Sequence, residues 1–194
     1  MSKQFSDLGI NEKLQKSLAD LKISVPTDIQ KKCIPIVLNK KEDLVALAKT
    51  GTGKTAAFGL PLLQLIDTKN TAVQAVILAP TRELAQQIHT IAAVCGGIPI
   101  KPQIERLKIA THVVVATPGR LVDLVKREAI NIKNLKYLVL DEADEMVSAL
   151  KEDLDTIIQG IPKSRRTLLF TATMPGTIKQ LVQNYMSKHV IHVE

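Results

Sequence analysis

A glycine-rich turn that carries a lysine and a threonine is the part of this chain best suited to chemistry. It runs from Ala48 to Thr55 and lies between the apolar run Leu44–Leu47 and a helical pattern over Thr55–Ile66. Glycines let backbone N–H groups point at an anion, and the N-terminus of the next helix adds the positive end of its dipole. Lys54 can then reach the β- and γ-phosphates of a nucleotide, and the hydroxyl of Thr55 can hold Mg²⁺. The strict pattern begins with Gly rather than Ala48, so an ordinary glycine-rich turn is the alternative interpretation.

An acidic cluster, Asp141-Glu142-Ala143-Asp144, follows the apolar run Tyr137–Leu140. Asp141 can orient Mg²⁺ directly or through water, and Glu142 can position or deprotonate an attacking water. Acidic residues are also favoured in the first turn of a helix, so the cluster alone is compatible with a solvated helix start. Together with a phosphate-binding loop in one domain, it favours nucleotide hydrolysis.

Three further apolar runs end in polar residues. The segments that follow these runs are Pro80-Thr81-Arg82, Thr117-Pro118-Gly119-Arg120 and Thr171-Ala172-Thr173. The first two place a hydroxyl and a guanidinium near a helix N-terminus, which suits the phosphates of a nucleic-acid backbone. Taken singly, each is also explained by a helix cap with a surface arginine.

Composition limits the class of protein. The chain has 194 residues, of which 45% are hydrophobic and 23% charged, which suits one soluble domain. The net charge of +7 permits a polyanionic partner. Aromatic residues make up only 3%, so the nucleic-acid backbone is the expected handle rather than stacked bases. The sequence shows neither a membrane-length apolar run nor a signal peptide, so we expect a cytoplasmic protein without membrane contact.

Short apolar runs alternate with helical patterns along the chain. The predicted strands are Leu44–Leu47, Ala75–Ala79, Thr90–Val94, His112–Ala116, Tyr137–Leu140, Thr167–Phe170 and Val190–Val193. The predicted helices are Glu12–Leu21, Asp28–Leu38, Thr55–Ile66, Glu83–Ile88, Lys101–Ile109, Gly119–Arg127, Glu145–Ile158 and Gly176–Met186. Near-continuous apolar strands are typical of a parallel sheet buried on both faces. The pattern predicts one α/β domain over residues 1–194, with a mostly parallel central sheet and helices on both faces.

Taken together, these residues resemble the DEAD-box family of ATP-dependent RNA helicases over nearly the whole chain. The resemblance implies the first of two RecA-like domains, with a P-loop NTPase fold that binds ATP and Mg²⁺. The family's phosphate loop also begins with alanine, which implies nucleotide contacts from Ala48, Thr50, Gly51, Thr52, Gly53, Lys54 and Thr55. Lys54, Asp141 and Glu142 are the implied catalytic residues. The segment Pro26–Gln30 is similar to the adenine-recognition motif, in which Gln30 would read the adenine edge and Thr27 would help to hold the phosphate loop.

The resemblance also implies an RNA site and its link to the nucleotide. The implied contacts to the RNA backbone are Pro80, Thr81, Arg82, Gly97, Gln103, Arg106, Thr117, Pro118, Gly119 and Arg120. Thr171 and Thr173, through a bond to Asp144, would couple the two sites. Two residues depart from the family pattern: Ile23 stands where an aromatic residue usually packs on adenine, and Thr171 stands where serine is usual.

The link between Pro80–Ala85 and Gly96-Gly97 is shorter than in the family. Strands Ala75–Ala79 and Thr90–Val94 should be parallel, and parallel strands need a crossover of about a dozen residues or more. A helix over Glu83–Ile88 would span only about 9 Å, whereas a five-residue strand spans about 17 Å. We therefore expect either that a stretch of chain is missing near His89, or that Thr90–Val94 lies differently from the family's strand.

Two other functions remain as rivals. A P-loop DNA translocase would share the phosphate loop, and a nucleotide-dependent binding module would share the fold without turnover. The resemblance implies a second RecA-like domain, which has no counterpart in these residues. We therefore expect a monomer that binds ATP and RNA but, without that domain, hydrolyses little ATP.

Overall fold

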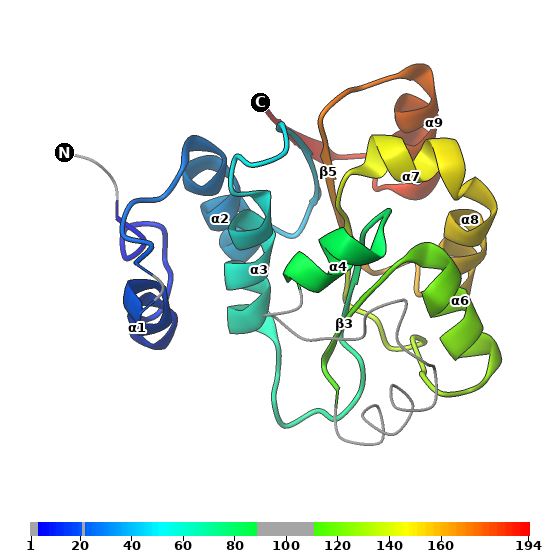
Figure 1. The fold of residues 1–194 in the computed structure, drawn as a ribbon, viewed down its shortest axis with the longest axis horizontal. Helices are drawn as coiled ribbons and strands as arrows, with labels where there is room; N and C mark the ends of the chain where they lie inside the picture. Colours follow the sequence, from blue (N-terminus) through cyan, green and yellow to red (C-terminus); the bar gives the residue numbers. More distant parts are fainter. Residues whose placement is uncertain (1–3, 21, 89–110) are drawn as a thin grey trace.

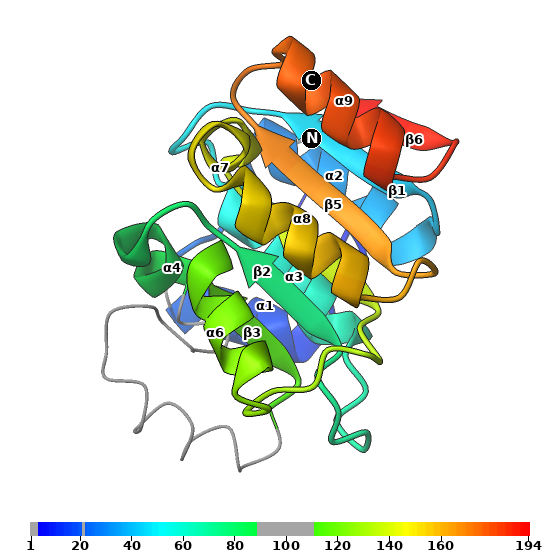
Figure 2. The ribbon, with the colours of Figure 1, turned by 90° about the vertical axis from the view of Figure 1, so that its right-hand side faces the viewer.

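A computed structural model describes residues 4–20, 22–88 and 111–194. Its centre is a six-stranded sheet in the order β3-β2-β4-β5-β1-β6, and every described strand pair is parallel (Figure 2). The strands are β1 (Asp43–Leu47), β2 (Ala75–Leu78), β3 (Val113–Ala116), β4 (Tyr137–Leu140), β5 (Arg166–Thr171) and β6 (Val190–Val193). Residues on both faces of the four inner strands are mostly buried, which accounts for their near-continuous apolar sequences.

Helices cover both faces of the sheet (Figures 1 and 2). The helices are α1 (Glu12–Asp20), α2 (Asp28–Asn39), α3 (Lys54–Leu65), α4 (Arg82–Ile88), α6 (Pro118–Lys126), α7 (Ala143–Ala149), α8 (Lys151–Gly160) and α9 (Gly176–Tyr185). Of these, α1 packs on α2 and α3 rather than on the sheet (Figure 1). Helices α2, α3 and α4 share one apolar cluster with the sheet, and α6 to α9 share another on the opposite face. The predicted layers are therefore confirmed for the described residues.

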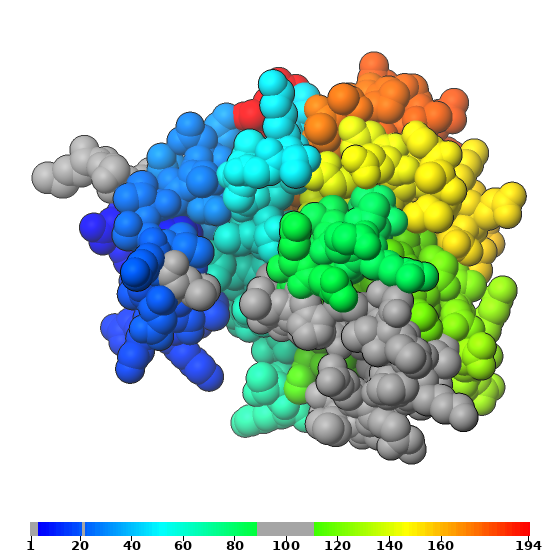
Figure 3. Space-filling model, in the orientation of Figure 1, coloured from blue at the N-terminus to red at the C-terminus, as the bar shows by residue number. Residues whose placement is uncertain are grey.

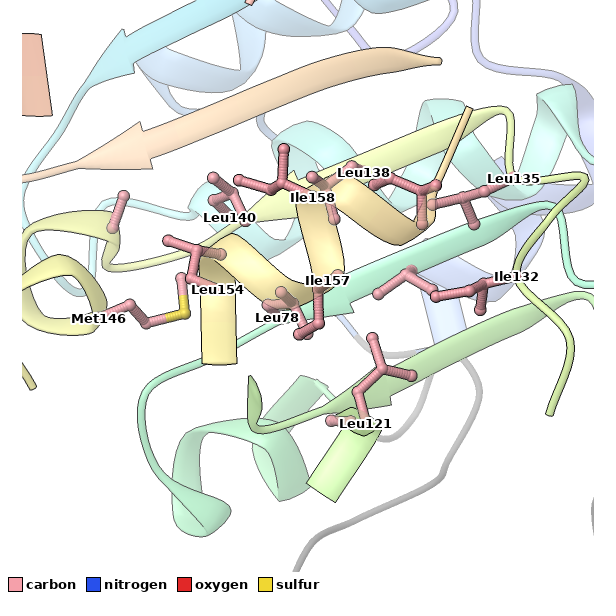
Figure 4. Packing of buried hydrophobic residues seen from close by; sticks show 14 of the residues in the cluster. Leu78, Leu121, Ile132, Leu135, Leu138, Leu140, Met146, Leu154, Ile157 and Ile158 are labelled. Atoms are coloured by element: carbon pink, nitrogen blue, oxygen red, sulfur yellow. The ribbon is translucent and has the colours of Figure 1, made fainter. Parts of the chain in front are cut away.

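The larger cluster fixes the strands beneath the helices that follow them. Figure 4 shows Leu78 of β2 beside Ile157 of α8, with Leu138 of β4 and Leu121 of α6 in the same layer. All four side chains are at most 3% exposed. Burial of one such side chain stabilises a fold by about 1.5–3 kcal/mol, so this layer holds the strand ends in register.

One predicted helix, Glu145–Ile158, is wrong as a single element. It is two helices, α7 and α8, with a break at Leu150, where φ is −133° and ψ is 29°. The break lets α7 pack on α9 and β5 while α8 packs on α6. No glycine or proline marks this bend, because the packing on both sides rather than a local residue type decides it.

Two predicted elements, Thr90–Val94 and Lys101–Ile109, lie outside the described residues, so the expectation about the short crossover stays a prediction. Within the described part of the chain, no helix is both long enough and apolar enough to span a bilayer.

Candidate functional site

The phosphate loop links β1 to α3 and is shaped by two glycines with positive φ. Gly51 has φ +81° and Gly53 has φ +93°. A Cβ on Gly53 would lie 2.4 Å from Nε2 of Gln30, so only glycine fits there. The Ala48 amide donates to the Thr171 carbonyl at 2.9 Å, which fixes the start of the loop to β5. The loop therefore has the backbone form that an anion-binding turn requires.

The lysine of the loop meets the acidic cluster at the end of β4. Lys54 is only 5% exposed, and its Nζ donates to Oε1 of Glu142 at 2.7 Å. The same Nζ lies 3.6 Å from Oδ1 of Asp141. The Thr50 hydroxyl also donates to Oε1 of Glu142, at 2.8 Å. The structure thus brings Lys54, Asp141 and Glu142 together as the sequence predicts.

Burial governs the electrostatics of Asp141. Desolvation raises the pKa of this carboxyl to about 6; the nearby Glu142 carboxylate adds to the rise, and the Lys54 ammonium opposes it. Glu142 has φ 51° and ψ 51°, a left-handed conformation that is strained for a residue with a side chain. Strain of this kind gathers at functional sites, and the strained residue is the one whose carboxylate accepts from Lys54.

Helix α2 is tied to the phosphate loop through Gln30, which is 4% exposed. Its Nε2 donates to the Gly53 carbonyl at 3.0 Å, and its Oε1 accepts from the Thr27 amide at 3.0 Å. Both ends of the side-chain amide are therefore engaged with the protein. Thr27 lines a hollow of about 410 Å³ with Ala48 and Thr52 of the loop, whereas Gln30 and the 39%-exposed Ile23 are not among its described lining residues.

A second link joins the acidic cluster to the end of β5. Oδ2 of Asp144 accepts from the hydroxyl of Thr173 at 2.7 Å and from its amide at 3.0 Å. The hydroxyl of Thr171 donates to the Thr173 carbonyl at 2.8 Å. Burial would raise the pKa of Asp144, but bonds from Thr173 and the Thr171 hydroxyl together hold it below its usual value. Thr173 therefore donates two hydrogen bonds to Asp144, and the hydroxyl of Thr171 lies close enough to help lower the pKa of that carboxyl.

The two loops predicted to contact RNA lie side by side, because β2 and β3 are neighbours in register. Oγ1 of Thr81 accepts from the Leu84 amide at 3.2 Å and caps α4, and Arg82 is exposed. In the other loop, Pro118 is buried at the start of α6, and Arg120 lies 3.7 Å from Asp123. Pro80 and Thr117 are half-buried. The remaining predicted RNA contacts, Gly97, Gln103 and Arg106, lie outside the described residues.

Asp153 lies close to this edge, although no pattern in the sequence indicates it. Oδ2 of Asp153, on α8, lies 3.1 Å from where a Cβ of Gly119 would stand. This close approach explains the glycine at the start of α6. Sequence reasoning missed Asp153, because the contact joins two helices that are far apart in the chain.

All these loops follow the carboxyl ends of parallel strands, so they gather at one edge of the sheet. Figure 3 shows the segments of the phosphate loop (cyan), α7 (yellow) and α4 (green) adjoining on one face. In open α/β sheets, ligands bind at this edge. The arrangement has the parts that nucleotide phosphates, a metal ion and a phosphodiester backbone need.

Comparison with known proteins places this arrangement in a family. The model of the DEAD/DEAH box helicase family matches residues 27–181. The chain belongs to the DEAD/DEAH box helicase family. A crystal structure of a DEAD box protein from Methanococcus jannaschii superposes with a TM-score of 0.89 and 38% identity, covering 100% of this chain and 57% of that one. The predicted RecA-like fold is thereby confirmed.

DEAD-box relatives are similar along most of the chain. It is 44% identical to the ATP-dependent RNA helicase CshA of Listeria monocytogenes over 94% of its length, which covers 38% of that protein. It is 41% identical to a probable ATP-dependent RNA helicase of Methanocaldococcus jannaschii over 95% of its length, which covers 53% of that protein. The chain therefore spans only about two fifths to one half of these curated DEAD-box proteins.

Proposed function

We propose that this chain is the ATP-binding RecA-like domain of a DEAD-box RNA helicase, and that it couples ATP hydrolysis to RNA unwinding when joined to a second RecA-like domain. The contact between the phosphate-loop lysine and the buried carboxylates that follow β4 carries the proposal. Lys54 lies 2.7 Å from Glu142 and 3.6 Å from Asp141. A cation and two carboxylates at the mouth of a phosphate loop suit a hydrolase for nucleoside triphosphates.

The donor set fits ATP with Mg²⁺. The hydroxyl of Thr55 and the carboxylate of Asp141 are hard oxygen ligands of the kind that Mg²⁺ prefers, directly or through water. When bound, Mg²⁺ would neutralise charge that develops on the phosphates. The loop amides and Lys54 would hold the phosphates, and the hollow beside Thr27 and Ala48 would admit the base.

The pairing of Lys54 suggests how the water-activating residue is held before substrate binds. Oε1 of Glu142 accepts from both Lys54 and Thr50. Phosphate oxygens would compete for Lys54, because they carry more charge than one carboxylate. Glu142 would then lose one of its two partners and could accept a proton from water. ATP binding would in this way prepare the residue that hydrolysis needs.

RNA would bind along the same edge. Arg82 and Arg120, with the start of α6, would contact backbone phosphates rather than bases. The bond between Asp144 and Thr173 would connect this edge with the nucleotide, because it joins the acidic cluster to the loop after β5. A DNA translocase would share these parts, so stimulation of ATP hydrolysis by RNA and by DNA must be compared directly.

The test replaces Glu142 by glutamine in the natural full-length protein. Glu142→Gln keeps an oxygen that can accept from Lys54 and Thr50, so ATP affinity should change by less than about threefold. RNA-stimulated hydrolysis should fall by about 10²–10⁴, the usual contribution of a general base.

Glu145→Gln is the matched control, because it makes the same change at an exposed position in the first turn of α7. Its turnover should stay near that of the natural protein. Normal hydrolysis by Glu142→Gln would remove Glu142 from the reaction, and equal stimulation by DNA would favour the translocase.

A further inference from the structure

A hollow of about 840 Å³ lies at the opposite edge of the sheet, beyond the amino ends of β4 and β5. Figure 2 shows the amino end of β5 pointing away from the edge that carries the phosphate loop, and β4 runs parallel to it. The walls come from the C-terminal end of α2, the end of α3, and the segments that lead into β4 and β5. None of the residues assigned to ATP or RNA above lines it.

Five cations line this hollow, and its described lining contains no carboxylate. We call it the basic hollow, and its cations are Lys40, Lys41, Lys133, Lys136 and Arg166. The four lysines are exposed, and within the described part of the chain none of them forms a salt bridge. Unpaired ammonium groups around one concave surface attract polyanions.

Part of this charge has an ordinary structural use. Arg166 is 7% exposed and donates to the carbonyls of Val37 and Glu42 at 2.7 and 2.6 Å, so it closes the C-terminal end of α2. Lys40 and Lys41 follow that helix end, where a partial negative charge favours cations. The Glu42 carboxylate accepts from the Lys41 amide and adds one negative charge nearby.

Lys133 and Lys136 have no such use. They lie on the segment before β4, several residues after α6 ends at Lys126. Nζ of Lys136 makes only a long bond of 3.4 Å to the side-chain amide of Gln74. A helix end carries about half a charge, so the basic hollow keeps a clear excess of positive charge after its structural needs are met.

The remaining lining favours nucleic acid over an acidic peptide. Half-buried Tyr137 packs partly on the apolar cluster of α2 and α3, and the rest of its ring lines the hollow, where a base can stack. Asn134 offers a side-chain amide, whereas the amides of Asn39 and Asn70 also bond to the protein backbone. Stacking on an aromatic ring in a basic groove is the usual chemistry of single-strand binding. An acidic peptide could also use the lysines and the amides, but its carboxylate side chains cannot stack on the ring as a base can.

We propose that the basic hollow is a second contact site for single-stranded RNA, separate from the loops after β2 and β3 that carry Arg82 and Arg120. RNA held at the carboxyl edge would extend around the domain and place further phosphates against Lys133 and Lys136. The inference rests on the proposed RNA-binding function. The basic hollow would bind RNA without sequence preference, whether or not ATP is bound to the domain.

The experiment measures binding of a fluorescent polyuridine oligonucleotide to the 194-residue chain over a series of salt concentrations. The variant Lys133→Gln/Lys136→Gln should bind RNA more weakly. Its affinity should also depend less steeply on salt, with the slope of log affinity against log salt reduced in magnitude by up to about 1.4, since each single-strand phosphate contact contributes about 0.7. Its ATP affinity should not change. Lys13→Gln/Lys16→Gln removes two exposed lysines of α1 that do not line the hollow, and this control should bind more tightly than the test variant.

A third variant, Arg82→Ala, separates this inference from the proposed function. Suppose that the unaltered chain binds RNA, that Arg82→Ala weakens this binding, and that Lys133→Gln/Lys136→Gln binds as well as the control. The RNA site at Arg82 is then supported, and the proposal for the basic hollow is overturned. If the unaltered chain binds no RNA, both fall. If the lysine variant instead loses only binding of a polyglutamate peptide, the hollow holds an acidic protein and the RNA proposal is overturned.

Discussion

Lys54 shows how a single side chain serves both the fold and the proposed chemistry. Its ammonium is buried between Glu142 and Asp141, so the site holds its own counter-ion before any phosphate arrives. Two buried carboxylates without this cation would carry a large desolvation cost. The lysine therefore stabilises the two buried carboxylates, and in the proposed function it would also bind phosphate.

Replacement of Lys54 should reveal both roles. Lys54→Ala should abolish tight ATP binding and lower the free energy of unfolding at pH 8 by on the order of 1–3 kcal/mol, because two carboxylates lose their partner. Nucleotide titration and denaturant unfolding measure the two effects. Lys49→Ala, at an exposed position of the same loop, is the control. Unchanged ATP affinity in Lys54→Ala would remove the lysine from the site.

Asp141 should make stability fall as pH rises, in the absence of Mg²⁺ and nucleotide. Its pKa is about 6 in the folded chain against an ordinary 3.8, so the folded state binds the proton more tightly than the unfolded state. The penalty therefore develops between about pH 4 and pH 6 and is complete above that range. Asp141→Asn should raise the free energy of unfolding at pH 8 by on the order of 1–3 kcal/mol and leave it unchanged at pH 4.

Denaturant unfolding at the two pH values checks this expectation. Asp20→Asn, at an exposed position on α1, is the control and should show no such difference. An equal effect of Asp141→Asn at both pH values would mean that Asp141 is charged throughout, and that burial does not govern its titration.

At the scale of elements, the phosphate loop and α2 behave as one unit. Gln30 reaches from the first turn of α2 to the carbonyl of Gly53, and Thr27 lies on the same side. A buried amide that loses its bond costs about 1–3 kcal/mol. The conformation of the phosphate loop therefore depends on α2, a helix that comes before β1 in the chain.

Two glycine variants test this dependence. Gly53→Ala should destabilise the chain by on the order of 1 kcal/mol more than Gly51→Ala. Both glycines have positive φ, so the backbone strain is similar, but only a Cβ at Gly53 displaces Gln30. Thermal and denaturant unfolding of the two variants give the comparison. Equal losses would show that the Gln30 bond contributes nothing to stability.

At the scale of the molecule, parallel topology collects the functional loops. In the order β3-β2-β4-β5-β1-β6, β4 lies between β2 and β5. The acidic cluster follows β4, Arg82 follows β2, and Thr173 follows β5. Because every described pair is parallel, all these strands end at the same edge. The loops of the proposed nucleotide site and of the proposed RNA site therefore lie at one edge of the sheet.

Hydrolysis should need more than this domain. A second RecA-like domain would supply an arginine to the γ-phosphate, and such an arginine contributes about 10³–10⁵ in rate. Residues 1–194 should therefore bind ATP but show RNA-stimulated turnover at least about 10³-fold below that of the natural full-length protein. A steady-state ATPase assay of both compares them. Similar turnover would mean that this chain closes its own site, for example by dimerising.

Local features of this protein were determined by the sequence alone. The six described strands were predictable because strands buried on both faces read as short apolar runs, and β4 (Tyr137–Leu140) has the predicted bounds. The phosphate loop was predictable because Gly51 and Gly53 supply its backbone angles within a few residues. The acidic cluster and the threonine–arginine loops were predictable because each directly follows a strand.

Only the tertiary structure decided the contacts between these pieces. The pairing of Lys54 with Glu142 joins residues 88 positions apart, and the bond from Gln30 to Gly53 joins residues 23 apart. The bend at Leu150 and the basic hollow likewise arise where helices and loops from different crossovers meet. Local sequence patterns indicate which side chains are buried and which turns are possible. They do not record which buried surfaces face each other, because that depends on strand order and on packing of the whole chain.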